Sequence, residues 1–260
     1  MSATPLERAT LDELTKAPYI RVLTYPKISL RSAKSRIAQL RGLKVDQLIF
    51  EGRAKIGRLG ILGLGTVGLV VRAEVGGEVR ALKIRRTDAN RPSMDQEAAI
   101  SSKVNRLGIG PQVYGHSKDF ILMQLLVYQE LDDWLRGLRG RGTREAVREL
   151  VHAILNQSRK LDIMGIDHGQ LSNLRKHAVV SEGKPWIIDF ESAGTSRRPR
   201  NVTSAAQYLL IGGKISPRMR RMLGIRSTAT MIKLLSRYKG TPDDYTYAKI
   251  LEYLRVSTKQ

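Results

Sequence analysis

The sequence predicts an α+β fold of two lobes: a β-rich N-terminal lobe with one helix and a mostly helical C-terminal lobe, preceded by a small basic extension. Residues 48–84 combine glycines with β-branched runs, which is typical of strands joined by tight turns. Residues 143–164 repeat apolar side chains at helical spacing. The 260 residues, 42% of them hydrophobic, suffice for a sizeable core. We expect the extension at 1–50, the first lobe at 51–126 and the second at 127–260.

The charge and the cysteine content restrict the class of protein. The chain has no cysteine, which excludes disulfides and thiolate metal sites. It has no apolar run long enough to span a membrane and no signal-peptide pattern, so we expect a cytoplasmic protein without membrane insertion. The net charge of +21 indicates a polyanionic partner, with nucleic acid first and an anionic membrane surface second. Segments 16–44 and 197–239 contain Lys and Arg but no acid, so we expect RNA contacts there.

The N-terminal extension divides into three short segments with different predicted structures. Residues 1–15 predict a short helix or a loose terminus. Residues 16–30 predict a strand or loop, because Pro18 and Pro26 flank their apolar stretch. Residues 31–42 predict a basic helix that ends at Gly42, and its apolar face consists of Ala33, Ile37 and Leu40. This extension is either an RNA-contacting arm or an extra layer on the next lobe.

A glycine pattern follows, G-x-G-x-x-G-x-V. Its fixed positions are Gly63, Gly65, Gly68 and Val70. Glycines let a backbone approach phosphates closely, with N–H groups aimed at the anion. The same pattern opens dinucleotide-binding units, but those need a helix directly after the third glycine. Residues 69–75 are strand-like, so a strand–turn–strand hairpin is favoured, and Lys83 lies on the next strand beyond a turn at Gly76–Gly77.

Residues 93–106 predict the helix of the first lobe, with Ser93 as its N-cap. Glu97 falls one turn into that helix, where its carboxylate would hold Lys83 by a charge-assisted hydrogen bond. Strands are predicted at Val113–Tyr114 and Phe120–Val127. The segment from Met123 to Leu126 is expected to form the hinge between the lobes.

Several helices are predicted in the second lobe. They are expected at residues 131–139, 143–164, 202–210, 217–223, 228–239 and 242–253. After the long helix comes a polar loop, Gly165–Asn173, whose polar side chains are Asp167, His168, Gln170, Ser172 and Asn173.

Asp189 follows the apolar run Trp186–Ile188, which predicts a buried strand. A carboxylate that ends a buried strand is costly unless something pairs with it. Mg²⁺ is one such partner, because it takes carboxylate and phosphate oxygens.

The ordered motifs resemble the protein kinase superfamily over about residues 57–191. Within it the chain is most similar to the atypical, RIO-like archaeal kinases, which are predicted serine/threonine kinases. The strings that carry the closer resemblance are A-L-K-I-R-R-T-D-A-N-R (81–91), D-H-G-Q-L-S (167–172), I-I-D-F-E-S-A (187–193) and N-V-T-S (201–204).

The resemblance implies a bilobal protein-kinase-like fold that uses ATP and Mg²⁺. It implies that Gly63, Gly65 and Gly68 cover the phosphates, that Val70 belongs to the nucleotide site, and that Lys83 contacts the α- and β-phosphates and pairs with Glu97. It further implies that Asp189 binds the metal, His168 is the structural histidine of the catalytic loop, Met123 is the gatekeeper, and the backbone up to Leu126 meets the adenine.

The chain departs from the family pattern at three places. Gln170 stands where the family has its catalytic Asp, and an amide is not a useful proton acceptor. The family's metal-binding Asn would fall on Arg175, so the candidate for this role is Asn173, which comes two residues too early. Glu191 replaces the glycine of D-F-G. Asp167 could supply a base from a shifted loop.

Three functions remain open from the sequence. The first is an ATP- and Mg²⁺-dependent kinase or ATPase acting with RNA or a ribosomal precursor, or on a protein phosphoacceptor. The second is a pseudokinase that binds nucleotide and RNA without turnover. The third is a small-molecule phosphotransferase, which would need an acidic pocket for a cationic substrate, and the acid-free C-terminal run argues against it.

Overall fold

The computed structural model describes residues 6–256. The chain forms two compact units. The first consists of Met1–Asn105 and Pro111–Leu126, and the second of Arg106–Gly110 and Val127–Gln260. Antiparallel sheets and helices occur together, so the α+β class is confirmed.

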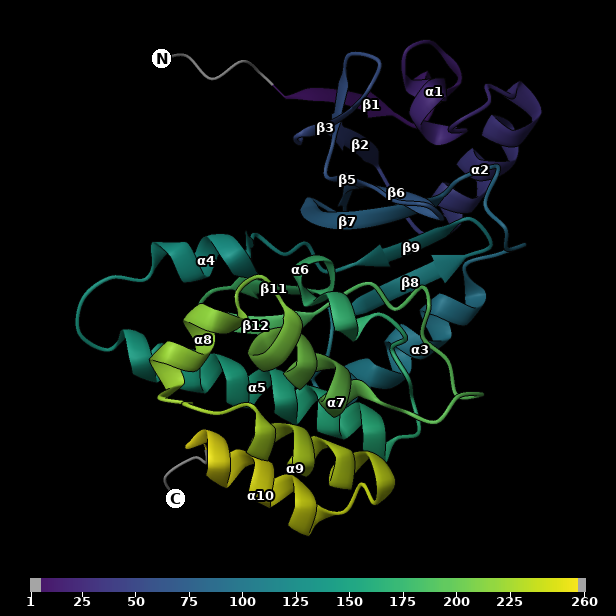
Figure 1. The fold of residues 1–260 in the computed structure, drawn as a ribbon. Helices are drawn as coiled ribbons and strands as arrows, with labels where there is room; N and C mark the ends of the chain where they lie inside the picture. The colour runs from purple at the N-terminus through teal and green to yellow at the C-terminus, as the bar shows by residue number, and fades with distance from the viewer. Residues whose placement is uncertain (1–5, 257–260) are drawn as a thin grey trace. The chain divides into compact units, whose positions relative to one another are not determined.

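The first unit is built on a seven-stranded antiparallel sheet of order β1-β2-β6-β7-β9-β8, with β5 paired to β6 (Figure 1). The strands are β1 (Glu7–Thr10), β2 (Gln47–Phe50), β5 (Gly63–Leu64), β6 (Gly68–Val75), β7 (Glu78–Arg85), β8 (Val113–Ser117) and β9 (Phe120–Met123). A separate hairpin joins β3 (Ala54–Ile56) to β4 (Leu59–Ile61). The single helix after the central hairpin is α3 (Asp95–Asn105), and Ser93 Oγ accepts a hydrogen bond from its first N–H at 3.4 Å.

The N-terminal segment adds β1, the short helices η1 (Glu13–Thr15) and α1 (Tyr19–Leu23), and α2 (Leu30–Gly42). The predicted helix at 31–42 is confirmed, and Ser29 caps it by accepting from Ser32 N at 3.2 Å. The expectation of a short helix or loose terminus at 1–15 is wrong for Glu7–Thr10, because β1 pairs with β2 far along the chain, and among the described residues of this segment a short helix forms only at η1. The expectation of a strand or loop at 16–30 holds for residues 16–18 and 24–29, which are turns and loop, and is wrong for Tyr19–Leu23, where α1 forms with Pro18 as its N-cap residue.

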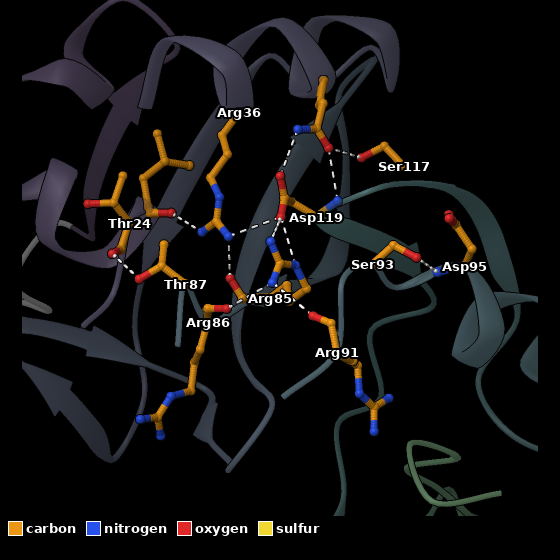
Figure 2. A network of polar contacts seen from close by, with 12 residues as sticks. Thr24, Arg36, Arg85, Arg86, Thr87, Arg91, Ser93, Asp95, Ser117 and Asp119 are labelled. Carbon is orange, nitrogen blue, oxygen red and sulfur yellow. Dashed lines mark hydrogen bonds and ion pairs between the residues drawn. The ribbon is translucent and has the colours of Figure 1, made fainter. Parts of the chain in front are cut away.

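Arg36 joins this segment to the sheet (Figure 2). Its side chain is only 2% exposed and donates to the Leu23 carbonyl at 2.5 Å, to the Arg85 carbonyl at 2.6 Å and to Asp119 Oδ1 at 3.1 Å. The Asp119 carboxylate also accepts from Gln39 Nε2 at 2.8 Å and from Arg85 Nε at 2.8 Å. The segment is therefore a packed layer of the first unit.

The second unit is mostly helical around the three-stranded sheet β10-β11-β12 (Figure 1). Its strands are β10 (Gln129–Glu130), β11 (Ala178–Ser181) and β12 (Lys184–Ile187). Its helices are α4 (Leu131–Gly137), α5 (Thr143–Ile163), η2 (Leu171–Asn173), α6 (Leu174–His177), α7 (Asn201–Ala206), η3 (Gln207–Gly212), α8 (Ser216–Leu223), α9 (Ala229–Gly240) and α10 (Asp244–Leu254). The predicted stripe on α5 is buried, namely Val147, Leu150, Val151, Ile154, Leu155 and Leu161.

Several element boundaries differ from those predicted. The helix expected at 202–210 ends as α-helix at Ala206 and continues as the π-helical turn η3. The strand expected to reach Val127 ends at Met123. β12 ends at Ile187, so Asp189 lies in the loop after the strand. Residues 6–256 include no helix that combines the length and the apolar character needed to cross a membrane.

Candidate functional site

The glycine pattern forms the predicted hairpin in the first unit. Gly63 pairs with Val70 and Leu64 with Leu69, and Gly65 N donates to Gly68 O at 2.8 Å to close the turn. A strand follows the third glycine, so a dinucleotide-binding unit is ruled out for this segment. A Cβ on Gly68 would lie 2.9 Å from the Ile84 carbonyl oxygen and 3.3 Å from the Lys83 side chain. A side chain at this position would therefore clash with the backbone of β7, which carries Lys83.

Lys83 projects from the centre of the sheet, where it pairs with Val70 on β6 and Ile121 on β9. Its Nζ lies 2.7 Å from Glu97 Oε1 on α3, and the side chains are 9% and 5% exposed. The expected pairing of these residues is therefore present. A buried ammonium is costly without a partner, so Glu97 holds the charge of Lys83 at one defined place.

The residues expected to meet the base lie at the end of β9. Met123 pairs with Ala81 on β7 and is half-buried, as are Leu126 and Val70. Gln124 N donates to the Gln112 carbonyl at 2.8 Å, which fixes the start of the segment beyond the strand. Contact with adenine stays a prediction for these three side chains and for the 124–126 backbone.

In the second unit, the polar loop Gly165–Asn173 follows the C-terminal end of α5. Gly165 has φ +68°, and Ile166 N donates to Leu161 O at 3.0 Å, which is the geometry of a Schellman helix end. Asp167 then exchanges two backbone hydrogen bonds of 2.9 Å with Gly194. Its carboxylate lies 2.9 Å from Arg197 Nε. Arg197 is paired with the Asp167 carboxylate. Arg197 would have to move away before Asp167 could accept a proton as a base.

His168 is fully buried behind this loop. Its Nε2 lies 3.1 Å from the Ile188 carbonyl oxygen, and its backbone N donates to Asn201 Oδ1 at 2.9 Å. Burial is the largest influence on the ring and lowers the pKa of His168 to about 4, outweighing the Ile188 carbonyl and the nearby carboxylates. The ring is therefore neutral at pH 7 and connects the polar loop to the segment that carries Asp189.

Gln170 and Asn173 occupy different environments. Gln170 is half-buried, and its Oε1 has no hydrogen-bond partner among the residues described. Asn173 is exposed at the end of η2, and its backbone N–H donates to Gln170 O at 2.9 Å. The amide of Gln170 is thus positioned inside the loop, whereas that of Asn173 faces solvent.

Asp189 has a left-handed backbone with φ +65°. A non-glycine residue in this region is uncommon, although Asp tolerates it better than most, and such residues concentrate at functional sites. Asp189 Oδ2 lies 3.8 Å from Nδ1 of His177, the last residue of α6. Burial, the largest influence, lowers the pKa of His177 despite the carboxylates of Asp189 and Glu191, so this ring is neutral at pH 7.

The sequence did not identify two residues of this region, Asn201 and His177. Asn201 accepts from the His168 backbone and donates to Asp162 Oδ1 at 2.8 Å and to the Ile166 carbonyl at 2.7 Å. The only signal in the sequence was the N-V-T-S string, to which no role was assigned. His177 was also missed, and its position directly before an apolar strand run was the signal that could have identified it.

The side chains of Asp189 and His177 suit a metal ion that binds together with a nucleotide. Within residues 6–256, no group of three or more His, Asp or Glu side chains is placed to hold a metal ion alone. Asp189 and His177 bring one oxygen and one nitrogen within 3.8 Å. Mg²⁺ is commonly bound by one or two protein ligands plus substrate phosphates, so two donors suit a metal that arrives with a nucleotide.

The backbone of Gly169 offers a stability test of the polar loop. Its φ is +83°, and a Cβ would lie 2.6 Å from Arg197 Nη2 and 2.9 Å from the Ser192 carbonyl oxygen. We expect Gly169→Ala to lower the free energy of unfolding by about 2–3 kcal/mol, from backbone strain and the clash together. Urea unfolding followed by the fluorescence of Trp134 and Trp186, both in the second unit, measures this.

The matched control for this experiment is Gly165→Ala. Gly165 also has a left-handed φ, +68°, but a Cβ there meets nothing within 4 Å. We expect this variant to show the strain alone, about 1–2 kcal/mol. Equal losses in the two variants would show that Arg197 yields without cost and does not hold the loop.

Comparison with known proteins identifies a similar archaeal protein. No known family profile matches the chain. Over 82 residues the chain is 33% identical to an uncharacterized protein of Methanocaldococcus jannaschii, MJ1211, and the match spans 32% of this chain and 70% of the archaeal protein. The name of that protein states no activity.

Proposed function

The chain belongs to the same family as the Methanocaldococcus jannaschii protein MJ1211, and because that protein's name states no activity, we propose a function from the chain's own residues. The protein is an ATP- and Mg²⁺-dependent phosphoryl-transfer protein with a bilobal protein-kinase-like fold, an atypical RIO-like serine/threonine kinase or ATPase. The observation that carries the proposal is the buried Lys83–Glu97 pair beside a glycine-rich hairpin.

Each residue group has a task in this proposal. The glycine hairpin presents backbone N–H groups to phosphates, and Lys83, fixed by Glu97, donates to them from a buried position. Asp189 holds the metal through its carboxylate. When bound, Mg²⁺ neutralises charge on the phosphates, which together with positioning supplies most of the catalysis of phosphoryl transfer.

Gln170 favours water over a serine hydroxyl as the acceptor. An amide does not take a proton usefully, but glutamine orients the attacking water in some nucleotidases. The Oε1 atom of Gln170 is buried and has no hydrogen-bond partner among the described residues, so it is available to accept from a water. ATP hydrolysis is therefore the reaction that these residues suit better than rapid transfer to a protein.

We expect Lys83→Met to weaken ATP binding about 10–100-fold, because a charge-assisted hydrogen bond contributes roughly 1.5–3 kcal/mol. Isothermal titration calorimetry with ATP and Mg²⁺ measures the change. Lys55→Met is the matched control, because Lys55 is exposed on β3 and carries the same charge. Failure of the wild-type protein to bind ATP in the presence of Mg²⁺ would contradict the proposal.

RNA or a ribonucleoprotein such as a ribosomal precursor is the proposed partner. In the first basic segment, Arg36 is buried against Asp119, but other cations are exposed, namely Arg21, Lys27, Arg31, Lys34 and Lys44. In the second segment, Arg198 donates to the Gly240 carbonyl and Arg220 to the Leu210 carbonyl, whereas the exposed cations include Arg200, Lys214, Arg221 and Lys233. The exposed cations of both segments are the ones available to phosphates.

The second candidate is a nucleotide- and RNA-binding pseudokinase, which the amide at Gln170 favours. The Lys83→Met variant also addresses it, because Lys83 is buried and lies outside the exposed basic segments. RNA affinity should be unchanged in this variant, and in both proteins the logarithm of the affinity should fall linearly with the logarithm of the salt concentration. ATP binding by the wild type without any turnover would favour the pseudokinase over the ATPase.

A further inference from the structure

The ring of His177 carries a nitrogen that the fold leaves without a partner. The side chain is 7% exposed, and Nδ1 has no hydrogen-bond partner among the described residues. A buried polar atom without a partner costs about 1–3 kcal/mol and calls for an explanation. Asp189 Oδ2 lies 3.8 Å from this nitrogen, which is too far for a hydrogen bond.

We propose that His177 Nδ1 and the Asp189 carboxylate bind one divalent cation, and that His177 takes the metal-binding role expected of Asn173. Two adjacent ligand atoms that each contact one cation at about 2.0–2.2 Å lie roughly 2.8–3.6 Å apart. The 3.8 Å separation of the two atoms is slightly longer, so a small movement of either side chain brings both into contact with one cation. The proposal rests on the proposed function, in which a metal accompanies the nucleotide, and adds a ligand and a metal preference to it.

The fold brings these two residues together by strand pairing. Ala178, the first residue of β11, pairs with Ile187, the last residue of β12, so the residues just before and just after this pairing lie at the same end of the sheet. The Ile188 N–H also donates to the His177 carbonyl at 3.0 Å, which fixes the two backbones next to each other. Asn173 is on η2, before α6, and its side chain is exposed.

A nitrogen ligand changes which metal the site prefers. Mg²⁺ takes oxygen ligands, whereas imidazole suits transition metals such as Fe²⁺, Ni²⁺ and Zn²⁺. A pair of one imidazole and one carboxylate, completed by phosphate oxygens or water, therefore favours first-row transition cations over Mg²⁺. The expected metal is Mn²⁺ or a later member of that row.

A second pair in the chain has the same separation and serves as the control. His116 Nε2 lies 3.8 Å from Asp95 Oδ1 in the first unit, but these side chains are 45% and 63% exposed. Water can satisfy both groups of the exposed pair. The His177–Asp189 pair differs because Nδ1 of His177 is buried and has no hydrogen-bond partner among the described residues.

The first test is the affinity of the full-length protein for Mn²⁺ and Mg²⁺ without nucleotide, measured by isothermal titration calorimetry. We expect His177→Asn to lower the Mn²⁺ affinity on the order of 10–100-fold and to change the Mg²⁺ affinity far less, because asparagine offers an oxygen in place of the nitrogen. His116→Asn should change neither. An unchanged ratio of Mn²⁺ to Mg²⁺ affinity in His177→Asn would overturn the proposal.

The second test needs no variant. The chain has four histidines, so selective ¹⁵N-histidine labelling gives a short, assignable set of ring signals. Titration with Zn²⁺ should shift the Nδ1 signal of His177 and leave His116 and His152 in place. If Zn²⁺ leaves His177 unshifted, the proposal fails even when ATP binds with Mg²⁺, whereas absence of ATP binding alone contradicts only the proposed function.

Discussion

Replacing Asp189 with alanine is expected to lower the single-turnover rate of ATP hydrolysis on the order of 10²–10³-fold, the usual cost of removing a group that stabilises transition-state charge. The side chain is 33% exposed and projects from a left-handed backbone position, so it can reach a ligand. In the proposed function its carboxylate holds the cation that accompanies the phosphates. Rapid-quench measurement with protein in excess over labelled ATP and with saturating divalent cation gives the rate.

The controls for this experiment separate chemistry from folding. Asp133→Ala removes an exposed acid from α4 of the same unit and should leave the rate unchanged. Gln170→Ala should lower the rate while leaving ATP affinity unchanged, since the proposed task of Gln170 is to orient water. If Asp189→Ala hydrolyses ATP at the wild-type rate, Asp189 does not hold the metal. The proposed kinase-like function would then lose support.

In the first unit, the glycine hairpin and the Lys83–Glu97 pair were predictable because their signals are local. Glycine spacing and β-branched residues around positions 63–75 require a hairpin, and the structure has it. Glu97 lies one turn into a helix that a short connection joins to the strand of Lys83. Short connections leave few geometries, so the spacing alone was sufficient to predict the contact of 2.7 Å.

The N-terminal layer was not predictable, because long-range contacts decide it. Strand β1 forms by pairing with residues about forty positions later, from Glu7 opposite Phe50 to Thr10 opposite Gln47. Arg36 stands in a basic run that reads as a solvated or RNA-binding face, yet it is buried. Nothing near it in the sequence identifies its acceptors, Leu23 O, Arg85 O and Asp119.

In the second unit, the metal-binding role expected of Asn173 rested on residue counting. The family spacing from His168 falls on Arg175, and Asn173 was the nearest amide. In the structure, η2 and α6 both precede β11, which makes His177 the residue at the start of the strand pair. Strand pairing rather than residue count fixes which side chain faces Asp189, and pairing depends on contacts that spacing does not encode.

The largest expected loss of stability comes from Asp119→Ala, in the network of Figure 2. Asp119 is 9% exposed and lies within 3.1 Å of Arg36 Nη2 and 2.6 Å of Arg85 Nη2. Its removal leaves two poorly exposed guanidinium groups without their carboxylate. Breaking a buried pair in this way costs about 3–5 kcal/mol, and we expect that loss in the first unit.

The measurement must report on the first unit, and tryptophan fluorescence does not, since Trp134 and Trp186 lie in the second. Amide hydrogen exchange of β2, β6 and β7 under increasing urea follows the correct unit. Asp12→Ala is the matched control, because its carboxylate pairs with Arg41 at 2.9 Å but is 87% exposed. Exposed pairs contribute about 0–1 kcal/mol, so a loss in Asp119→Ala as small as that in Asp12→Ala would contradict a structural role for the network.

The same network predicts a pH dependence. Burial alone would raise the pKa of Asp119, but the hydrogen bond from Gln39 and the charges of Arg36 and Arg85 outweigh it and hold that pKa below its ordinary value. An aspartate with a lowered folded pKa stabilises fully above its unfolded pKa, about 3.9, and the stabilisation is lost as pH falls through the folded value. The wild type should therefore lose stability in the first unit below about pH 4, and Asp119→Ala should lose less over the same range. Parallel curves for the two proteins would show that other carboxylates control the acid unfolding of this unit, and that the Arg36 layer is held by packing rather than by charge.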